Sequence, residues 1–431
     1  MNANTKFIYH NVGQGLFYSG NIMTSNSAFR FIYDCGSERI KLINTSICRF
    51  KCDINDDSEI DLLIISHLHS DHISGLDELF NNFTIKEVVL PYLSPTERLL
   101  IALRRINLPT WYYNFLSDPV EYLFKRGVKR IILLGGKEGG KGEIPPENLS
   151  PSSPEGDILE KLDIGKLSDD ENLKKEIFNS NENWERYIKT NKLLVKNHNG
   201  YVIALGLWVF RFFNYKHKIP PIVFRNFERC IRNNVSKKND NDINDNDIKR
   251  AIRDKKCLKS LKRCYTNLKK HLGNDFNNTS LVLYHGPKDR PKIESSFLCF
   301  CPHPYPCYFY SPRVCLNKIF FRGRNIHKYF GQLLTGDIDF NMNYNGLKKH
   351  YEYFREHVLI AQVPHHGSKN NWNSTVLRDF PNSKCWIISA GLENKYGHPS
   401  FEVVEDICSN GKKCCLVNEI IHMAIKGEVR W

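Results

Sequence analysis

Short apolar runs alternate with helical patterns at both ends of the chain. Runs rich in Val, Ile and Phe predict strands at residues 29–33, 62–65, 87–90, 129–134, 281–284, 332–334, 358–363, 386–389 and 420–425. Helical patterns cover residues 95–106, 120–126, 346–356 and 401–409. Strands that alternate with helices in this way indicate an α/β protein.

The middle of the chain has a different composition. Residues 135–166 are rich in Gly, Pro, Ser and charge, which predicts an exposed loop. Residues 237–247 are almost entirely Lys, Asn and Asp and are predicted to be flexible. Between these two polar segments, the apolar and aromatic residues 201–213 predict a core strand.

Residues 247–272 are predicted to form an amphipathic helix. Apolar side chains recur at helical spacing at Ile248, Ile252, Leu258, Leu261, Tyr265, Leu268 and Leu272. This stripe is expected to pack on the rest of the protein. The same segment carries ten Lys or Arg residues against two Asp. One hypothesis is that this basic face follows a phosphate backbone; the alternative is a solvated surface.

A dense group of polar residues follows the predicted strand at 62–65. Three imidazoles and a carboxylate occur within six residues, at His67, His69, Asp71 and His72. On an extended segment His67 and His69 face the same way. Imidazole with carboxylate suits zinc, iron or manganese better than calcium or magnesium. The spacing therefore predicts a metal site rather than scattered residues of a surface loop.

This spacing resembles the HxHxDH signature of the metallo-β-lactamase superfamily, and further motifs follow in the order expected of it. They lie at residues 11–15, 33–37, 277–283, 334–337, 364–368, 389–391 and 394–399. The ordered set is similar to the soluble hydrolase domain attached to bacterial DNA-uptake channels of the ComEC type, and it covers residues 5–92 and 275–431. The resemblance implies a metallo-β-lactamase-like αββα four-layer sandwich, here with a long basic insertion.

The resemblance and the composition together divide the chain. Residues 1–135 are expected to form the N-terminal half of the domain, 136–272 an insertion, and 273–431 the C-terminal half. The C-terminal half contains a predicted Cys-rich hairpin at about 291–330. Its Cys299, Cys301, His303, Cys307 and Cys315 fit either a structural zinc site or a packed loop.

The resemblance also implies a set of metal ligands, namely His67, His69, Asp71, His72, Asp337 and His365. Asp337 is the expected bridge between two metal ions, and one or two zinc or manganese ions are the expected cofactor. Neighbouring side chains of an extended segment point in opposite directions, so only one of His365 and His366 is expected to be a ligand. Family position favours His365, with His366 lining the site.

Many members of the superfamily have a further His where this chain has Asn277 and Ser280. One of the two metals is therefore expected to bind weakly. Substrate contacts are expected from Asn277, Ser280, His366, Ser368, Asn394 and His398. The expected catalytic residues are Asp71, as proton acceptor for the attacking water, and His398, as phosphate contact or proton donor.

The charge of the chain adds a preference for anionic partners. Of its 431 residues, 61 are Lys or Arg and 47 are Asp or Glu, a net charge of +14. This balance favours a nucleic acid or a nucleotide as substrate. No apolar run is long enough to cross a membrane, and the first residues do not resemble a signal peptide. We expect a cytoplasmic protein without a membrane partner, with its 14 Cys as reduced thiols.

These features predict a metal-dependent phosphodiesterase or nuclease. One alternative is a hydrolase of a small molecule such as a cyclic nucleotide, a lactone or a thioester. Another is a non-catalytic, metal-stabilised module that binds a protein partner through the insertion. A closed pocket would favour the small molecule, whereas an open basic groove would favour nucleic acid.

Overall fold

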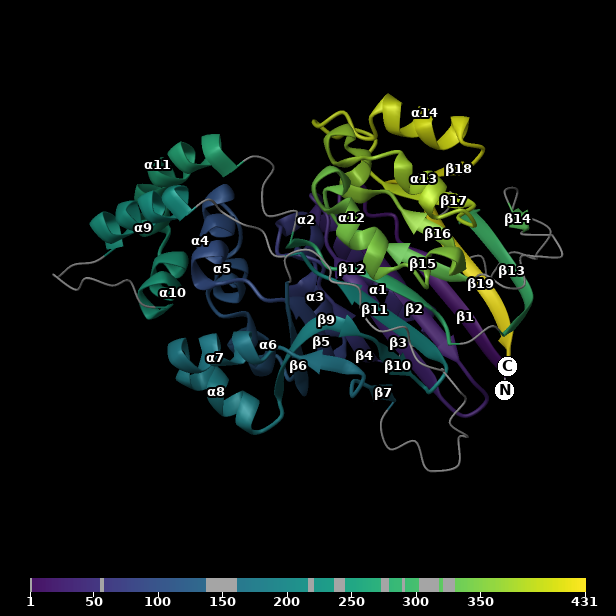
Figure 1. The fold of residues 1–431 in the computed structure, drawn as a ribbon, viewed down its shortest axis with the longest axis horizontal. Helices are drawn as coiled ribbons and strands as arrows, with labels where there is room; N and C mark the ends of the chain where they lie inside the picture. Colours follow the sequence, from purple (N-terminus) through teal and green to yellow (C-terminus); the bar gives the residue numbers. More distant parts are fainter. Residues whose placement is uncertain are drawn as a thin grey trace.

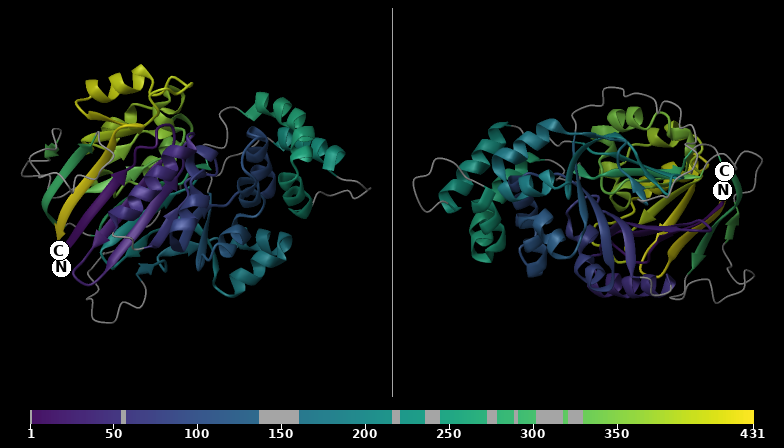
Figure 2. Two further views of the ribbon diagram at one scale, coloured as in Figure 1. Left: turned by 180° about the vertical axis from the view of Figure 1, so that it is seen from behind. Right: turned by 90° about the horizontal axis from the view of Figure 1, so that it is seen from below.

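The structure is a computed structural model that describes residues 2–54, 58–136, 161–215, 221–235, 245–272, 279–288, 291–301, 318–320 and 330–431. An 11-stranded sheet and an 8-stranded sheet, counted over these residues, stack face to face with helices on both outer faces (Figures 1 and 2). The predicted αββα four-layer sandwich is confirmed.

The first sheet is built mainly from the N-terminal half of the chain. Its strand order is β14 (Lys318–Phe320), β13 (Lys292–Cys301), β19 (His422–Arg430), β1 (Asn2–Tyr9), β2 (Phe17–Met23), β3 (Ala28–Cys35), β4 (Glu59–Ile64), β5 (Thr84–Pro91), β6 (Arg130–Gly135), β9 (Leu193–Gly200) and β8 (Leu167–Asp169). Strands β3, β4, β5, β6 and β9 are parallel. Their nearly continuous apolar runs agree with strands that are covered on both faces.

The second sheet is built mainly from the C-terminal half. Its order is β18 (Lys413–Val417), β17 (Cys385–Ser389), β16 (Val358–Gln362), β15 (Gly331–Leu334), β12 (Val282–Pro287), β11 (Trp208–Phe213), β10 (Val202–Ala204) and β7 (Leu162–Asp163). The single strand predicted at 201–213 is wrong. Leu205 and Gly206 adopt left-handed backbone angles, φ 50° and 69°, and turn this segment into the β10–β11 hairpin.

Aromatic side chains fill the space between the sheets. Phe7, Tyr18 and Phe31 of the first sheet meet Trp208 and Phe210 of the second, all fully buried. Helices α1 (Ile40–Asp53) and α3 (Leu76–Asn82) cover the outer face of the first sheet (Figure 2). The outer face of the second sheet is covered by α12 (Phe340–His350), α13 (Thr375–Asp379) and α14 (Phe401–Ser409). The first of these begins and ends earlier than the predicted helix at 346–356.

A group of helices stands beside the sandwich (Figure 1). It contains α4 (Pro95–Arg104), α5 (Thr110–Ser117), α6 (Pro119–Lys125), α7 (Glu171–Ser180), α8 (Glu182–Lys189), α9 (Pro221–Val235), α10 (Asp245–Arg253) and α11 (Lys255–Leu272). The one helix predicted at 247–272 is two helices, because the carboxylate of Asp254 accepts a hydrogen bond from Lys256 N at 2.8 Å and starts α11. Leu258 and Leu261 are fully buried, so the apolar stripe packs as predicted.

The cysteines of the helical group depart from expectation. Cys230 of α9 and Cys264 of α11 form a disulfide with their Cα atoms 6.0 Å apart, so the expectation of reduced thiols is wrong for this pair. Within the described part of the chain, no helix is both long enough and apolar enough to span a bilayer. The predicted zinc residues His303, Cys307 and Cys315 lie outside the described residues.

Asp118 joins three helices of the lateral group. Its carboxylate accepts hydrogen bonds from Lys249 Nζ of α10 at 2.7 Å, from Trp184 Nε1 of α8 at 2.9 Å and from Glu121 N of α6 at 3.1 Å. Burial opposes the ionisation of Asp118, but the charges of Lys249 and Arg98 outweigh it and lower its pKa. The carboxylate therefore stabilises the fold above the ordinary carboxyl pKa, and this contribution is lost as pH falls through the lower folded-state value.

We expect Asp118→Ala to lower the free energy of unfolding by about 3 kcal/mol at pH 7, because Lys249 is left buried without its partner. Urea denaturation at several pH values measures the loss. A matched control is Asp169→Ala, which removes a carboxylate that is 48% exposed and paired with Lys196, for which less than about 1 kcal/mol is expected. Equal losses in the two variants would contradict the role given to Asp118.

Candidate metal centre

The ends of strands from both sheets meet at one edge of the sandwich. After β4, a short loop and the helical turn α2 (Ser70–Ile73) carry His67, His69, Asp71 and His72. In the second sheet, Asp337 follows β15 and His366 follows β16. Parallel strands place their carboxyl ends at the same edge, so residues about 270 positions apart in the chain come together here.

Asp337 lies at the centre of this group and is only 2% exposed. Its Oδ1 atom is 3.1 Å from His72 Nε2 and 3.8 Å from His366 Nε2. Its Oδ2 atom is 3.6 Å from His67 Nε2 and 3.8 Å from His365 Nε2. Each carboxylate oxygen therefore faces its own pair of imidazoles.

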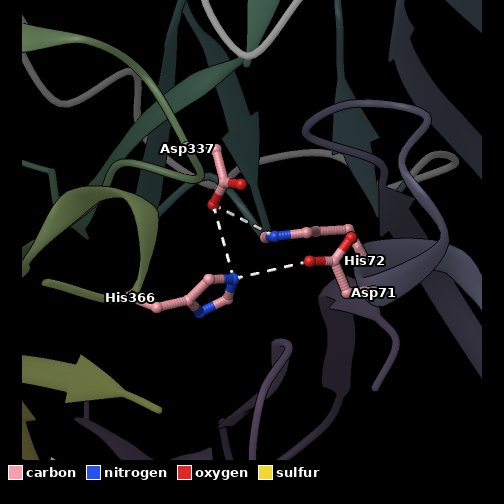
Figure 3. Close-up of side chains that lie close together, drawn as sticks. All are labelled: Asp71, His72, Asp337 and His366. Atoms are coloured by element: carbon pink, nitrogen blue, oxygen red, sulfur yellow. Dashed lines mark ion pairs between the residues drawn. The ribbon is translucent and has the colours of Figure 1, made fainter. Parts of the chain in front are cut away.

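Three sets of side chains at this edge have the composition of a metal site, and two of them contain Asp337. One of these two is Asp71, His72, Asp337 and His366, shown in Figure 3, and the other is His67, His69 and Asp337. The third set is Asp34, His67 and His72. Within each set the possible ligand atoms lie within 4.8 Å of one another. Asp337 is shared by two sets, as a bridging carboxylate would be.

Asp34 orients the imidazole of His72. Its Oδ2 atom is 2.7 Å from His72 Nδ1, and its two oxygens also accept hydrogen bonds from the amide and the hydroxyl of Ser66 at 2.6 Å each. The bond to His72 Nδ1 fixes the ring with Nε2 toward Asp337, and Nε2 is the atom that would bind a metal ion in place of its proton. In the sequence, Asp34 stands out only as part of the motif at residues 33–37. Its φ of 56° marks it as strained, a feature that clusters at functional sites.

The geometry favours His366 over His365 as the ligand. His366 has its Nδ1 atom 2.7 Å from the carbonyl oxygen of Ser389, and its Nε2 atom is 3.7 Å from Asp71 Oδ2. His365 is more exposed, and its Nδ1 atom is 2.9 Å from Asn371 Oδ1. Both residues have left-handed φ angles, 47° and 55°. The extended backbone assumed in the sequence argument is absent here, so the expected alternation does not apply.

Charges in the site are mutually compensated. Burial alone would raise the pKa of Asp337, but the imidazoles of His72, His365 and His366 outweigh it and hold that pKa well below its usual range. Burial would likewise raise the pKa of Asp71, but the hydrogen bond with His366 and the charge of His72 outweigh burial and lower this pKa. Burial opposes the charged form of His72, yet Asp337 and Asp34 raise its pKa well above the usual value.

The two remaining imidazoles of the motif behave differently. Burial lowers the pKa of His67 well below its usual value, and the charge of His72 adds to this effect. Burial and the neighbouring Arg104 do the same for His69. Both rings are therefore neutral at pH 7, the form in which an imidazole nitrogen can bind a metal.

Buried polar atoms test whether a divalent cation fits. His67 Nε2, His72 Nε2, His366 Nε2 and Asp337 Oδ1 are buried, and none has a hydrogen-bond partner of acceptable geometry among the described residues. Leaving such atoms unpaired costs free energy. Nitrogen and carboxylate ligands aimed at common points suit zinc or manganese, so the residues fit the expected cofactor.

Other predicted residues have supporting positions. Ser280 accepts a hydrogen bond from Asp337 N at 3.3 Å, so it holds the main chain of Asp337. Asn394 donates to the carbonyls of Gly391 and His398, which shapes the loop that carries His398. Ser368 is buried two residues after His366. Asn277 lies outside the described residues.

A cleft opens over the candidate metal ligands, and His398 lines it. Burial and the charges of His366 and His365 lower the pKa of His398 to about 4. Its ring is neutral at pH 7, so contact with a substrate oxygen suits it better than proton donation. The other walls of the cleft include Gln14 and Tyr396, which lie in the motifs at 11–15 and 394–399, and also Arg104, Arg105 and Tyr112, to which no motif of the sequence points.

Comparisons with known proteins agree with the N-terminal motifs. The family model described as "Anti-Pycsar protein Apyc1" matches residues 12–105. This segment contains His67, His69, Asp71 and His72 but is less than half of the chain, so it does not assign the family. No curated protein matches the sequence.

Among solved structures, a similarity is found to the metallo-beta-lactamase fold protein YhfI from Bacillus subtilis. The sequence identity is 7%, and the alignment covers 97% of this chain and 98% of that one, with a TM-score of 0.33. The fold described above therefore rests on the sheets and layers of the chain itself.

We expect His366→Ala to lose about half of the bound zinc or manganese, because one four-residue ligand set is broken. His365→Ala is the matched control and should keep the wild-type metal content. Asp34→Ala should weaken metal binding by about 10- to 100-fold, because His72 loses the partner that orients it. Elemental analysis and metal titration measure these effects. A loss of metal in His365→Ala with none in His366→Ala would reverse the assignment.

Proposed function

We propose that the chain is a metal-dependent phosphodiesterase. The observation that carries the proposal is Asp337, whose carboxylate is shared by two ligand sets at the floor of a cleft that arginines border. Divalent metal ions there would supply a nucleophilic water at neutral pH and stabilise negative charge on phosphate oxygens. A shared carboxylate suits this task because it holds two cations at a fixed separation.

The residues of the chain have distinct parts in this proposal. Asp71 is held ionised by His366 and His72, and it accepts a proton from the attacking water. His398 donates or accepts a hydrogen bond at a substrate oxygen. Asp34, Ser66 and the carbonyl of Ser389 fix the rings that surround the reacting atoms. A lactone or thioester would not use the positive wall of the cleft, which favours an anionic ester.

The lining of the cleft favours an anionic substrate. Two arginines, Arg104 and Arg105, border it beside the candidate metal ligands. At its rim, Arg105 is bonded to Glu38 and Tyr396, which brings the two halves of the chain together on one side. The match of the anti-Pycsar family model hints at degradation of a cyclic nucleotide. A cyclic nucleotide is therefore our preferred substrate class.

Nucleic acid is the second candidate. It is favoured by the net charge of +14, by the motif order that resembles the ComEC-type domain, and by exposed cations on α11. Other basic residues of this region have internal partners: Lys249 pairs with Asp118, Lys255 lies 6.0 Å from the Tyr113 ring, and Lys262 bonds to main-chain carbonyls. The basic face available to a backbone is thus smaller than the sequence suggested. We also propose that the protein is located in the cytoplasm.

We expect Asp71→Asn to lower kcat on a chromogenic phosphodiester by about 10²- to 10⁴-fold, because the proton acceptor is removed. Asp337→Ala should abolish turnover and reduce bound metal. Asp169→Asn, an exposed carboxylate far from the site in the chain, serves as the control. Assays with manganese and with zinc should compare cyclic mononucleotides with single- and double-stranded DNA and RNA. Full activity in both site variants would refute the metal mechanism.

A second experiment concerns the exposed face of α11. We expect replacement of Lys256, Lys259 and Arg263 by Gln to weaken binding of DNA or RNA of any sequence and to make its salt dependence shallower, by up to about three contacts. Hydrolysis of a cyclic nucleotide should not change, because these exposed side chains do not line the cleft. Unaltered nucleic-acid affinity in this triple variant would leave only the small-molecule candidate.

A further inference from the structure

Two consecutive arginines end helix α4 beside the metal centre. Arg104 is the last residue of the helix and Arg105 follows it with an extended backbone, φ −132° and ψ 110°. Both side chains line the cleft. They differ in what they contact, and this difference separates their functions.

Arg105 forms hydrogen bonds with residues at the wall and rim of the cleft. Its Nη2 atom donates to Glu38 Oε1 at 2.6 Å and to Tyr396 Oη at 3.1 Å, and its Nη1 atom donates to Ser70 Oγ at 3.1 Å. The pairing with Glu38 neutralises its charge locally. Arg105 therefore ties the rim together and is poorly placed to bind an anionic substrate.

Arg104 instead reaches the metal ligands. Its Nη1 atom lies 3.0 Å from His69 Nε2 and 3.3 Å from His69 Nδ1. The guanidinium therefore lies in the wall of the cleft, directly beside one candidate ligand. A planar guanidinium with several N–H donors matches the oxygens of a phosphate group.

A lysine from another helix holds the end of α4. Lys262 of α11 donates through Nζ to the carbonyl oxygens of Leu103 at 2.5 Å and Arg104 at 3.1 Å. The last carbonyls of a helix lack partners within the helix, and a cation there also complements the helix dipole. The contact fixes the backbone from which the Arg104 side chain extends.

The position of Lys262 is itself defined by packing. Leu258 and Leu261 of α11 are fully buried, and α11 lies against α4 (Figures 1 and 2). Helix α10 is secured to the same layer by Lys249 with Asp118 and by Arg253 with Ser117 Oγ at 2.8 Å. The lateral helices thus form a rigid support behind the end of α4.

We propose that Arg104 binds the phosphate group of the substrate and that Lys262 is a positioning residue that holds Arg104 over the metal centre. Lys262 belongs to the segment that the sequence predicts as an insertion. It would then influence the affinity of the site for an anion without contacting the anion itself. This inference rests on the proposed phosphodiesterase function for its substrate class. The anion-binding part can be tested separately.

The test compares Arg104→Gln, Lys262→Met, Lys262→Arg and the double variant Arg104→Gln/Lys262→Met. Arg250→Met on α10 is the control, because that side chain is 80% exposed. For each manganese-loaded protein, the dissociation constant of inorganic phosphate is measured by calorimetry, and KM and kcat are measured with a chromogenic phosphodiester. Metal content and melting temperature report on the fold and on the ligands.

We expect Arg104→Gln to weaken phosphate binding and raise KM by roughly 10- to 100-fold, with metal content unchanged. Lys262→Met should shift both values in the same direction by about fivefold, and Lys262→Arg should restore most of the loss. The double variant should match Arg104→Gln within about twofold, because Lys262 acts through Arg104. A purely structural Lys262 would instead lower the melting temperature and add its effect to that of Arg104→Gln.

Two results would overturn the proposal. Unchanged phosphate affinity and KM in Arg104→Gln would show that Arg104 does not bind the phosphate group. Unchanged values in Lys262→Met, with a clear effect in Arg104→Gln, would remove the positioning role. If the wild-type protein hydrolyses no phosphodiester, the proposed function fails, yet the phosphate dissociation constants still decide whether Arg104 and Lys262 form an anion site.

Discussion

Asp337 places a carboxylate where the ends of two sheets meet, almost completely out of contact with water. A buried charge of this kind is tolerated only when other groups compensate it. Here the compensation comes from three imidazoles, His72, His365 and His366, whose Nε2 atoms all lie within 3.8 Å of one of its oxygens. The carboxylate thereby organises every element that reaches this edge of the sandwich.

Three of the imidazoles at the site keep their orientations because the Nδ1 atom of each ring has a hydrogen-bond partner. His72 is bonded to Asp34, His67 to Ser66, and His366 to the carbonyl of Ser389. These partners lie on or directly after β3, β4 and β17, so the spacing of the sheets determines the spacing of the nitrogens. Strained left-handed backbone at Asp34, His365 and His366 is retained in the same small volume, which the surrounding packing must stabilise.

The lateral helices extend this organisation beyond the sandwich. Asp118 connects α6, α8 and α10, and Lys262 connects α11 to the end of α4. A segment that differs in composition from the rest of the chain therefore supports the wall of the cleft from behind, while the residues that line the cleft come from other segments. Because the support consists of ion pairs and buried apolar side chains, its stability and the affinity of the site are expected to depend on each other.

The sequence alone determined the α/β class and most strand positions, because these depend on local periodicity. The spacing of His67, His69, Asp71 and His72 predicted a metal site, and the family resemblance added Asp337 to the candidate ligands. Only the tertiary structure distinguished His366 from His365, since their left-handed backbone cannot be read from an apolar strand pattern. It alone also placed Asp34, Arg104 and Lys262 at the site. Those residues act through contacts between distant segments, and hydrophobic patterning carries no information about such contacts.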